Sequence, residues 1–463
     1  MTEGSLLRSL LGLSIPVVLT NLLQTAYQLI NTFWVGRLGT GPLAAASVSV
    51  PITFLLLSLG SGLSVAGSTL IAQYAGARNR DMVNHIAAQT ILMVMLASVV
   101  LSVVGLLIAP HILRLMGVDA SIFGMALQYL RVSFLGIVFM FTFAMFQSLL
   151  RGVGEVRMAL YIVLATVLLN GLLAPMFIRG WGPLPAGGVV GAAWATLVTQ
   201  GIAALVGFTL LLGNRYGIHL RAQDFRPDLR LIRRTFLLGL PASIEQSSRA
   251  LGLTILTFLV TSFGTLAIAT YGIGMRLLSV IFIPALGLSM ATTTVVAQNI
   301  GAGQERRAVE VGRLSAWLAF GILSVIGLIV FLGSRPIVRF FVPGDPELVE
   351  SAALFVRIAA ISFGFMGAQQ ALAGAFRGAG QMFMTMLLAI GALWVLQFPL
   401  AYVLSKHTTL GMVGIWWATP VSNVLLCLVS VVWFMGGTWH RKNLTREEEL
   451  DGQVAATIRL EES

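Results

Sequence analysis

The chain alternates between long apolar segments and short polar connections. Twelve apolar segments are long enough to cross the hydrocarbon core of a bilayer, which takes about 20 helical residues. They lie at 10–35, 43–73, 84–109, 120–150, 157–178, 189–213, 236–262, 266–298, 311–333, 348–376, 382–404 and 412–436. Since these segments are far longer than strands and carry few charges, the pattern predicts an all-α integral membrane protein with twelve transmembrane helices.

Composition supports the same class. Hydrophobic residues make up 57% of the 463 residues and charged residues 10%, and the mean hydropathy is +0.90. This leaves too little polar surface for a soluble protein. The net charge of +11 could indicate a nucleic-acid partner, but the basic residues lie between apolar segments and are not interleaved with aromatic ones. We therefore expect the lipid bilayer, and no nucleic acid, as a partner.

The distribution of Lys and Arg predicts the topology. Nineteen of them, Arg377 included, fall on the side of the two termini, and six fall on the other side, namely Arg37, Arg114, Arg179, Arg335, Arg339 and Lys406. By the positive-inside rule both termini are cytoplasmic. The first apolar segment is too long for a signal peptide and lacks a cleavage site, so we expect it to remain. The predicted location is the plasma (inner) membrane of a prokaryote.

The sequence repeats itself with a period near 225 residues. TLIAQYAGA at 69–77 returns as TVVAQNIGA at 294–302, and LLRGVG at 149–154 returns as AFRGAG at 375–380. GAAWAT and GIWWAT, and Pro16 and Pro241, form further pairs. The repeat predicts two six-helix bundles of the same orientation, related by a pseudo-twofold axis along the membrane normal.

The repeat and the charge pattern together suggest the domain organisation. We expect an N-terminal lobe at 1–213, a cytoplasmic linker at 214–235, a C-terminal lobe at 236–437 and a cytoplasmic tail at 438–463. The linker is charged and carries Pro227, and its six arginines suit a position near anionic lipid.

Several stretches carry a family resemblance. IPVVLTNLLQTAYQLINTFWVGRLGTGPLAA, the helix ends IAQYAGA and VAQNIGA, the turn FQSLLRGVGE and the helix start GLPASIEQ resemble the multidrug and toxic compound extrusion family, in particular its DNA-damage-inducible F (DinF)-type and archaeal-type branches. The resemblance covers residues 8 to about 437. It implies two six-helix lobes around a cavity, and export of bulky, often cationic compounds against entry of Na⁺ or H⁺.

The sequence departs from this family in its N-terminal half. Many members of these branches carry an aspartate where this chain has Asn31, and an acid where it has Ala174; Asn170 and Thr196 match. An amide has no proton to exchange and offers only a neutral oxygen to a cation, so the residues of this half do not support its use as the ion-coupling site. Four amides share one face of the first helix: Asn21, Gln24, Gln28 and Asn31. They either line the substrate cavity or join helices by hydrogen bonds.

Among the eighteen acids, Glu245 alone lies clearly within a predicted span. A carboxylate there is costly unless it is paired, protonated or hydrated, so it is a candidate coupling residue. Arg249, four residues later on the same helical face, and Arg276 in the next helix are its candidate partners. A structural Glu245–Arg249 ion pair is the alternative, and a tight pair would make Glu245 a poor proton carrier.

Other chemistry finds little support in the sequence. The five histidines fall in loops or near span ends, Cys427 is the one cysteine, and no Walker motif or cluster of His, Asp and Glu is present. We expect no metal site, no cofactor and no enzymatic activity. The interpretation is a secondary active exporter of small organic cations that works as a monomer, with H⁺ or Na⁺ as the coupling ion. A lipid-linked saccharide or lipid flippase is the alternative, and a channel or scaffold is disfavoured by the repeat.

Overall fold

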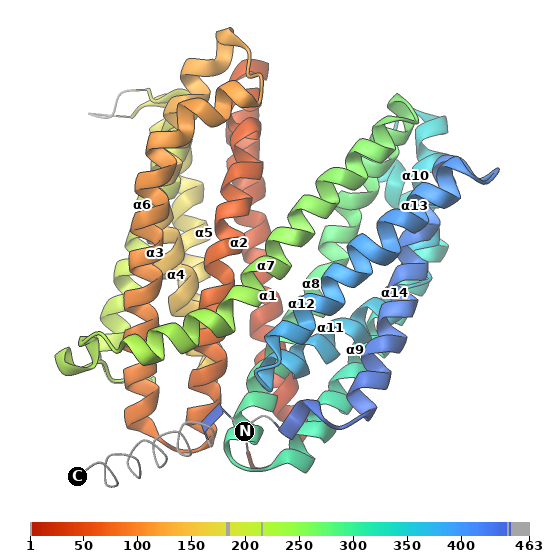
Figure 1. Cartoon of the computed structure of the whole chain (residues 1–463). Helices are drawn as coiled ribbons and strands as arrows, with labels where there is room; N and C mark the ends of the chain where they lie inside the picture. Colours follow the sequence, from red (N-terminus) through yellow and green to blue (C-terminus); the bar gives the residue numbers. More distant parts are fainter. Residues whose placement is uncertain (1, 182–185, 214–215, 442–443, 446–463) are drawn as a thin grey trace, which may run out of the picture. The chain divides into compact units, whose positions relative to one another are not determined.

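The computed structural model describes residues 2–181, 186–213, 216–441 and 444–445 (Figure 1). All regular structure in these ranges is helical. The α-helices are α1 (Leu6–Gly36), α2 (Thr40–Gly76), α3 (Arg80–Leu115), α4 (Ala120–Val153), α5 (Val156–Arg179), α6 (Gly188–Leu212), α7 (Leu229–Thr261), α8 (Thr265–Gly301), α9 (Glu305–Phe341), α10 (Pro346–Ala360), α11 (Phe363–Gly378), α12 (Met382–Ile390), α13 (Phe398–Lys406) and α14 (Met412–Met435). Short 3₁₀ helices lie at η1 (Ala222–Phe225) and η3 (Trp439–Arg441), and η2 (Gly391–Gln397) is π-helical.

The described helices account for the twelve expected spans, eleven by length and apolar composition and one, α7, by its length and place in the chain. Ten are long and apolar enough to cross a bilayer, with 382–406 taken as one span, and the pair α10 and α11, bent by 49°, supplies another. The twelfth is α7, which has 33 residues and is the least apolar of the helices. Its charges explain this, since three arginines lie in its first two turns and Glu245 and Arg249 lie in its middle. The prediction of an all-helical, twelve-span membrane protein in two bundles is confirmed.

One span changes its helical geometry partway. Residues 391–397 close their hydrogen bonds one residue later than an α-helix does, between α12 and α13. Pro399 follows directly, and proline has no N–H to donate to a carbonyl one turn back. The α-helical pairing is therefore interrupted here, and the wider π turns bridge the interruption.

By contacts the chain divides into two compact units. Of the described residues, the N-terminal unit contains those within 19–75 and 79–244, and the C-terminal unit contains those within 2–18, 76–78 and 245–445. The divisions within α1 and α7 fall shortly after Pro16 and Pro241, where a proline weakens the helix. The lobe boundaries expected from sequence, 1–213 and 236–437, stay a prediction.

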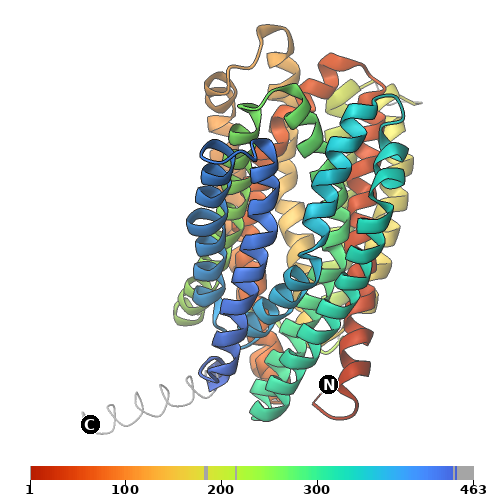
Figure 2. The same cartoon turned by 90° about the vertical axis from the view of Figure 1, so that its right-hand side faces the viewer.

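Each unit is held by close helix packing. In the N-terminal unit α4 contacts α3 and α6, and α6 contacts α5. In the C-terminal unit α8, α9 and α11 are mutual neighbours (Figure 2). An aromatic cluster fills the other part of this unit, where the ring of Trp416 lies 4.7 Å from that of Phe355 and 6.0 Å from that of Tyr271. Glycines permit the closest approaches: a Cβ on Gly274 would lie 2.0 Å from Phe355.

Candidate functional site

The C-terminal unit buries one carboxylate between two arginines. Glu245 of α7 is 1% exposed. Its Oε1 accepts a hydrogen bond from Nη2 of Arg377 at 2.7 Å and one from Nη2 of Arg249 at 3.1 Å. Both hydrogen bonds are charge-assisted, because each joins a guanidinium to the carboxyl oxygen. The buried acid predicted from the sequence is therefore part of an ion-pair cluster, with one negative and two positive groups.

Arg249 is the partner expected from helical spacing, and the i, i+4 pair is present. Arg276, the other candidate, has an exposed side chain and makes no ion pair with Glu245 in the part of the chain that the structure describes. Arg377 takes that place instead. It lies in the last turn of α11, and its side chain is only 18% exposed, against 33% for Arg249.

Sequence reasoning missed Arg377 because it was assigned to a loop on the side of the termini. The signal that could have found it is the repeat, in which LLRGVG and AFRGAG place Arg151 and Arg377 at equivalent positions. An arginine that recurs at the same helix end in both halves is unlike an ordinary loop arginine. Counting the Lys and Arg residues on each side of the membrane does not distinguish such an arginine from one in a loop.

The second oxygen of Glu245 is left open. Among the described residues, Oε2 is buried and has no hydrogen-bond partner. The hydroxyl of Thr385 on α12 lies beside the carboxyl, but it donates to the carbonyl of Met382 at 2.9 Å. A buried carboxylate oxygen without a donor is costly. It can accept a proton, a cation or a donor group, so the cluster has unused binding capacity.

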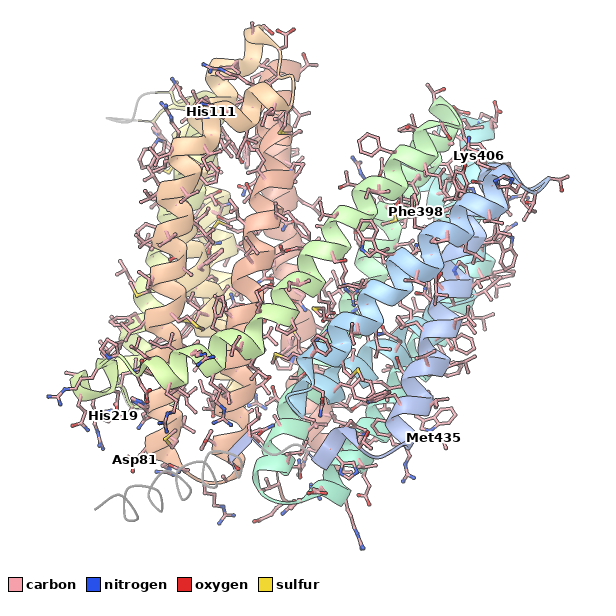
Figure 3. All side chains as sticks on the ribbon, viewed as in Figure 1. Asp81, His111, His219, Phe398, Lys406 and Met435 are labelled. Atoms are coloured by element: carbon pink, nitrogen blue, oxygen red, sulfur yellow. The ribbon has the colours of Figure 1, made fainter. Side chains whose placement is uncertain are left out.

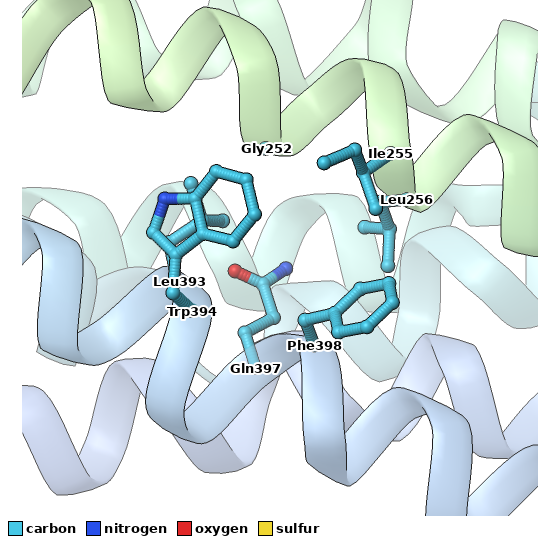
Figure 4. A pocket seen from close by; sticks show the side chains of 7 residues that line it. All are labelled: Gly252, Ile255, Leu256, Leu393, Trp394, Gln397 and Phe398. Atoms are coloured by element: carbon cyan, nitrogen blue, oxygen red, sulfur yellow. The ribbon is translucent and has the colours of Figure 1, made fainter.

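A narrow apolar pocket lies along α7 just past this cluster. Gly252, Ile255 and Leu256 of α7 form one side, and Leu393, Trp394, Gln397 and Phe398 form the other (Figure 4). The indole Nε1 of Trp394 donates to Oγ of Ser248 at 2.6 Å. The π-helical segment is thereby joined to α7 one residue before Arg249.

The N-terminal unit contains a polar cluster without charge. Nδ2 of Asn170 donates to Oδ1 of Asn31 at 2.8 Å, and Nδ2 of Asn31 donates to Oγ1 of Thr196 at 3.3 Å. The structure thus brings together three candidates from α1, α5 and α6. Tyr27, which sequence reasoning did not select, extends the cluster through a 2.8 Å hydrogen bond between its hydroxyl and Thr199.

The side chain at position 174 cannot bind an ion or form a hydrogen bond, because it is an alanine. Ala174 is fully buried in an apolar group with Val35, Ile178, Val189 and Ala195. The Oδ1 of Asn170 is buried and has no partner among the described residues. The cluster can therefore donate and accept hydrogen bonds, but it offers only neutral oxygens to a cation.

The remaining amides of α1 differ in their surroundings. Gln24 and Gln28 have exposed side chains, and Nε2 of Gln24 donates to Oε1 of Gln147 on α4 at 3.2 Å. Asn21 is partly buried, and its Nδ2 has no partner among the described residues. The four amides thus lie on one face of α1, and two of them already join helices.

Twelve membrane-crossing helices in two units, each with a polar site between its helices, are the architecture of a secondary transporter. The sequence profile of the MatE family matches residues 16–176 and 241–403, and the chain belongs to this family. The resemblance stated from sequence is confirmed.

Similar proteins cover nearly the whole chain. The probable multidrug resistance protein YoeA of Bacillus subtilis is 29% identical over 449 residues, which are 96% of each chain. The probable multidrug resistance protein NorM of Thermotoga maritima is 26% identical, over 95% of each chain. A solved outward-facing multidrug resistance MATE family transporter of the MOP superfamily superposes with a TM-score of 0.88 at 25% identity, covering 95% of this chain and 98% of that one.

Proposed function

We propose that this protein is a multidrug exporter that moves organic cations out of a prokaryotic cell against entry of H⁺ or Na⁺. The names of its relatives and its likeness to a solved multidrug transporter support the class of substrate. In this proposal the two halves of the chain alternate access to the substrate, both termini are cytoplasmic, and the protein acts as a monomer. No enzymatic step and no cofactor is involved.

The observation that carries the proposal is the state of Glu245. Export against a gradient requires a site whose occupancy differs between two conformations, because a ligand shifts an equilibrium only through such a difference. Glu245 is buried, ion-paired on one oxygen and unpartnered on the other. A site of this kind can hold its charge in one conformation and exchange its partner in another.

The charges indicate how coupling works. With Glu245 ionised, its charge offsets one of the two guanidiniums. When a proton neutralises Glu245, Arg249 and Arg377 repel one another across a buried space, and this repulsion favours separation of α7 from α11. Proton uptake at Glu245 is thereby linked to a movement of helices inside the C-terminal unit.

The neutral cluster serves a different purpose. Asn31, Asn170 and Thr196 do not gain or lose a proton in the accessible pH range. Oδ1 of Asn170 has no partner among the described residues, and the amides can exchange their present hydrogen bonds for bonds to a substrate. In this proposal the N-terminal unit contributes to binding and the C-terminal unit to coupling. The exposed Gln28 on the same face extends this surface.

The test is Glu245→Gln in proteoliposomes, with export of ethidium driven by an imposed pH or Na⁺ gradient. We expect gradient-driven export to fall at least tenfold, while ethidium still binds. Glu350→Gln is the matched control, because it removes a carboxylate from an exposed ion pair with Arg335 in the same unit. The control should export normally.

A second variant separates folding from coupling. Removing one partner of a buried pair destabilises a protein more than removing both, so Glu245→Gln combined with Arg377→Gln should fold better than the single variant. It should still fail to export. Export at the normal rate with an unchanged pH profile, in either variant, would overturn the coupling role.

A further inference from the structure

The connection between the predicted lobes is fastened to α3 by one buried amide. Gln89 is 1% exposed. Its Nε2 donates to the carbonyls of Asp224 and Arg226 at 2.7 Å each, and its Oε1 accepts from the backbone N–H of Asp228 at 3.0 Å. Three bonds from one side chain fix the backbone of residues 224–228. This part of the connection is a docked structural element.

Two further contacts hold it. The buried Asn84 accepts a hydrogen bond from the backbone N–H of His219 through Oδ1 at 2.7 Å. The ring of His85 lies 3.5 Å from the carboxylate of Asp228. Asn84, His85 and Gln89 all lie near the start of α3, and Figure 3 shows His219 at the same end of this unit as Asp81, with His111 at the other end.

The acids of this segment are occupied by its own backbone. Oδ2 of Asp224 accepts from the N–H of Arg221, and Oδ1 of Asp228 accepts from the N–H groups of Arg230 and Leu231. The side chains of the exposed arginines point elsewhere than to these carboxylates in the described structure. They are Arg221, Arg226, Arg230 and Arg233. The surface is therefore basic although two acids lie within it.

The first turns of α7 add an apolar face beside these arginines. Leu229, Phe236 and Leu237 are 77%, 45% and 54% exposed, and they share one helical face. The opposite face is buried, with Leu231 at 4% and Thr235 at 2%. Arg233 lies on this same face between Leu229 and Leu237, and Arg230 lies at its edge. The exposed side of the helix is therefore both apolar and basic, a combination that suits the interface of a membrane.

We infer that residues 216–237, the linker platform, form a binding surface for anionic phospholipid. The guanidiniums of Arg226, Arg230 and Arg233 bind headgroup phosphates, and Leu229, Phe236 and Leu237 enter the acyl layer. A soluble phosphate satisfies only the first half of this surface, whereas a phospholipid satisfies both. Because Gln89 holds the backbone of 224–228 in place, this part of the backbone is ordered before the lipid arrives, which reduces the entropy lost on binding.

The inference concerns neither substrate nor coupling ion, so it is independent of the proposed function. Each arginine near an anionic surface contributes about fivefold to affinity. Arg226→Gln combined with Arg230→Gln should therefore weaken binding of phosphatidylglycerol by on the order of tenfold or more. Arg157→Gln combined with Arg306→Gln is the matched control, because it also removes two exposed arginines. The control should bind as the parent does.

The experiment titrates the purified full chain in detergent with phosphatidylglycerol, phosphatidylcholine or inorganic phosphate, and records the thermal unfolding midpoint. We expect phosphatidylglycerol alone to raise the midpoint of the parent and the control. In the platform variant the rise should be at least halved. Leu237→Ser should reduce the rise as well, because it removes part of the apolar face.

Three outcomes would overturn the inference. The first is a platform variant that keeps the full response to phosphatidylglycerol, and the second is a control that loses the response equally. The third is an equal rise with inorganic phosphate, which would assign the arginines to a soluble anion.

Discussion

Arg377 and Glu245 are 132 positions apart in the chain, yet their side chains meet at 2.7 Å inside the C-terminal unit. Arg249, only four positions from Glu245, approaches the same oxygen at 3.1 Å. The long-range partner is both closer and less exposed than the local one. It therefore joins α11 to α7, whereas Arg249 reinforces a single helix.

This difference predicts unequal effects of the two arginines on stability. Breaking a buried pair costs about 3–5 kcal/mol, and a partly exposed one costs less. We expect Arg377→Ala to lower the free energy of unfolding by about 3 kcal/mol and Arg249→Ala by about 1 kcal/mol. Denaturation in detergent measures both. Equal losses, or the reverse order, would contradict the assignment of Arg377 as the main partner.

The neutral cluster of the N-terminal unit predicts that a variant there affects substrate binding and leaves the coupling of transport to the ion gradient unchanged. Asn31→Ala removes two hydrogen bonds and leaves Asn170 without its acceptor, at a cost of about 1–3 kcal/mol. We expect weaker substrate binding but an unchanged dependence of transport on the ion gradient. Asn31→Asp should leave transport intact or add ion sensitivity. Loss of gradient dependence in Asn31→Ala, with binding intact, would disprove this division.

Gly252 gives a prediction about packing beside the pocket. A Cβ at this position would lie 2.0 Å from Cδ2 of Leu393. Overpacking of this kind costs about 1–3 kcal/mol, so Gly252→Ala should lower the thermal midpoint. Leu393→Ala in the same chain removes the clash. The double variant should therefore be less destabilised than the sum of the two single variants, which a double-mutant cycle measures.

Asp228 predicts a dependence of stability on pH. Burial alone would raise the pKa of this carboxyl, but hydrogen bonds from Leu231, His85 and Arg230, with the charge of His85, outweigh it and lower the pKa below 3.8. A lowered pKa stabilises the fold above pH 3.8, and this stabilisation disappears as the pH falls through the lowered value. Asp228→Asn should reduce the thermal midpoint at pH 6 and match the parent at the lowest pH. A constant difference between the two proteins would refute this.

The role of Gln89 in holding the linker platform on α3 can be measured directly. Gln89→Ala leaves two carbonyls and one N–H of residues 224–228 without their partner. Amide hydrogen exchange in 217–228 should accelerate strongly, while exchange in α9 should stay unchanged. Asn84→Ala should affect only the neighbourhood of His219. Exchange rates in 217–228 equal to those of the parent would show that Gln89 does not hold the platform.

The sequence predicted those features that depend on periodicity and repetition. Twelve apolar segments gave the helices, and the spacing of Glu245 and Arg249 gave one ion pair. Arg377 was missed because a count of loop charges says nothing about which arginine turns inward. Gln89 was missed for a different reason. Its partners are backbone groups, which are the same in every residue, so the sequence does not indicate which of them it binds.

The neutral cluster was predicted only in part. Asn31, Asn170 and Thr196 were selected through family resemblance, and hydrogen bonds join them in the structure. Their role in substrate binding stays a prediction. Tyr27 was not selected, although it lies four residues before Asn31 on the same helical face. The π-helical segment could not be foreseen, because prolines also occur inside α1, α2, α3 and α5 without producing one.

The π-helical segment, residues 391–397, is a place where we expect the span to be able to turn about its own axis. A helix that changes from π to α closure over residues 391–397 advances its register by one residue, which turns the part beyond it by about 100° and shifts it by about 1.5 Å. The turn would move Gln397 away from Thr419, its partner at 3.0 Å, while Trp394 stays on Ser248. We expect such a change to present different side chains of the span 382–406 to α14, while the span itself stays helical.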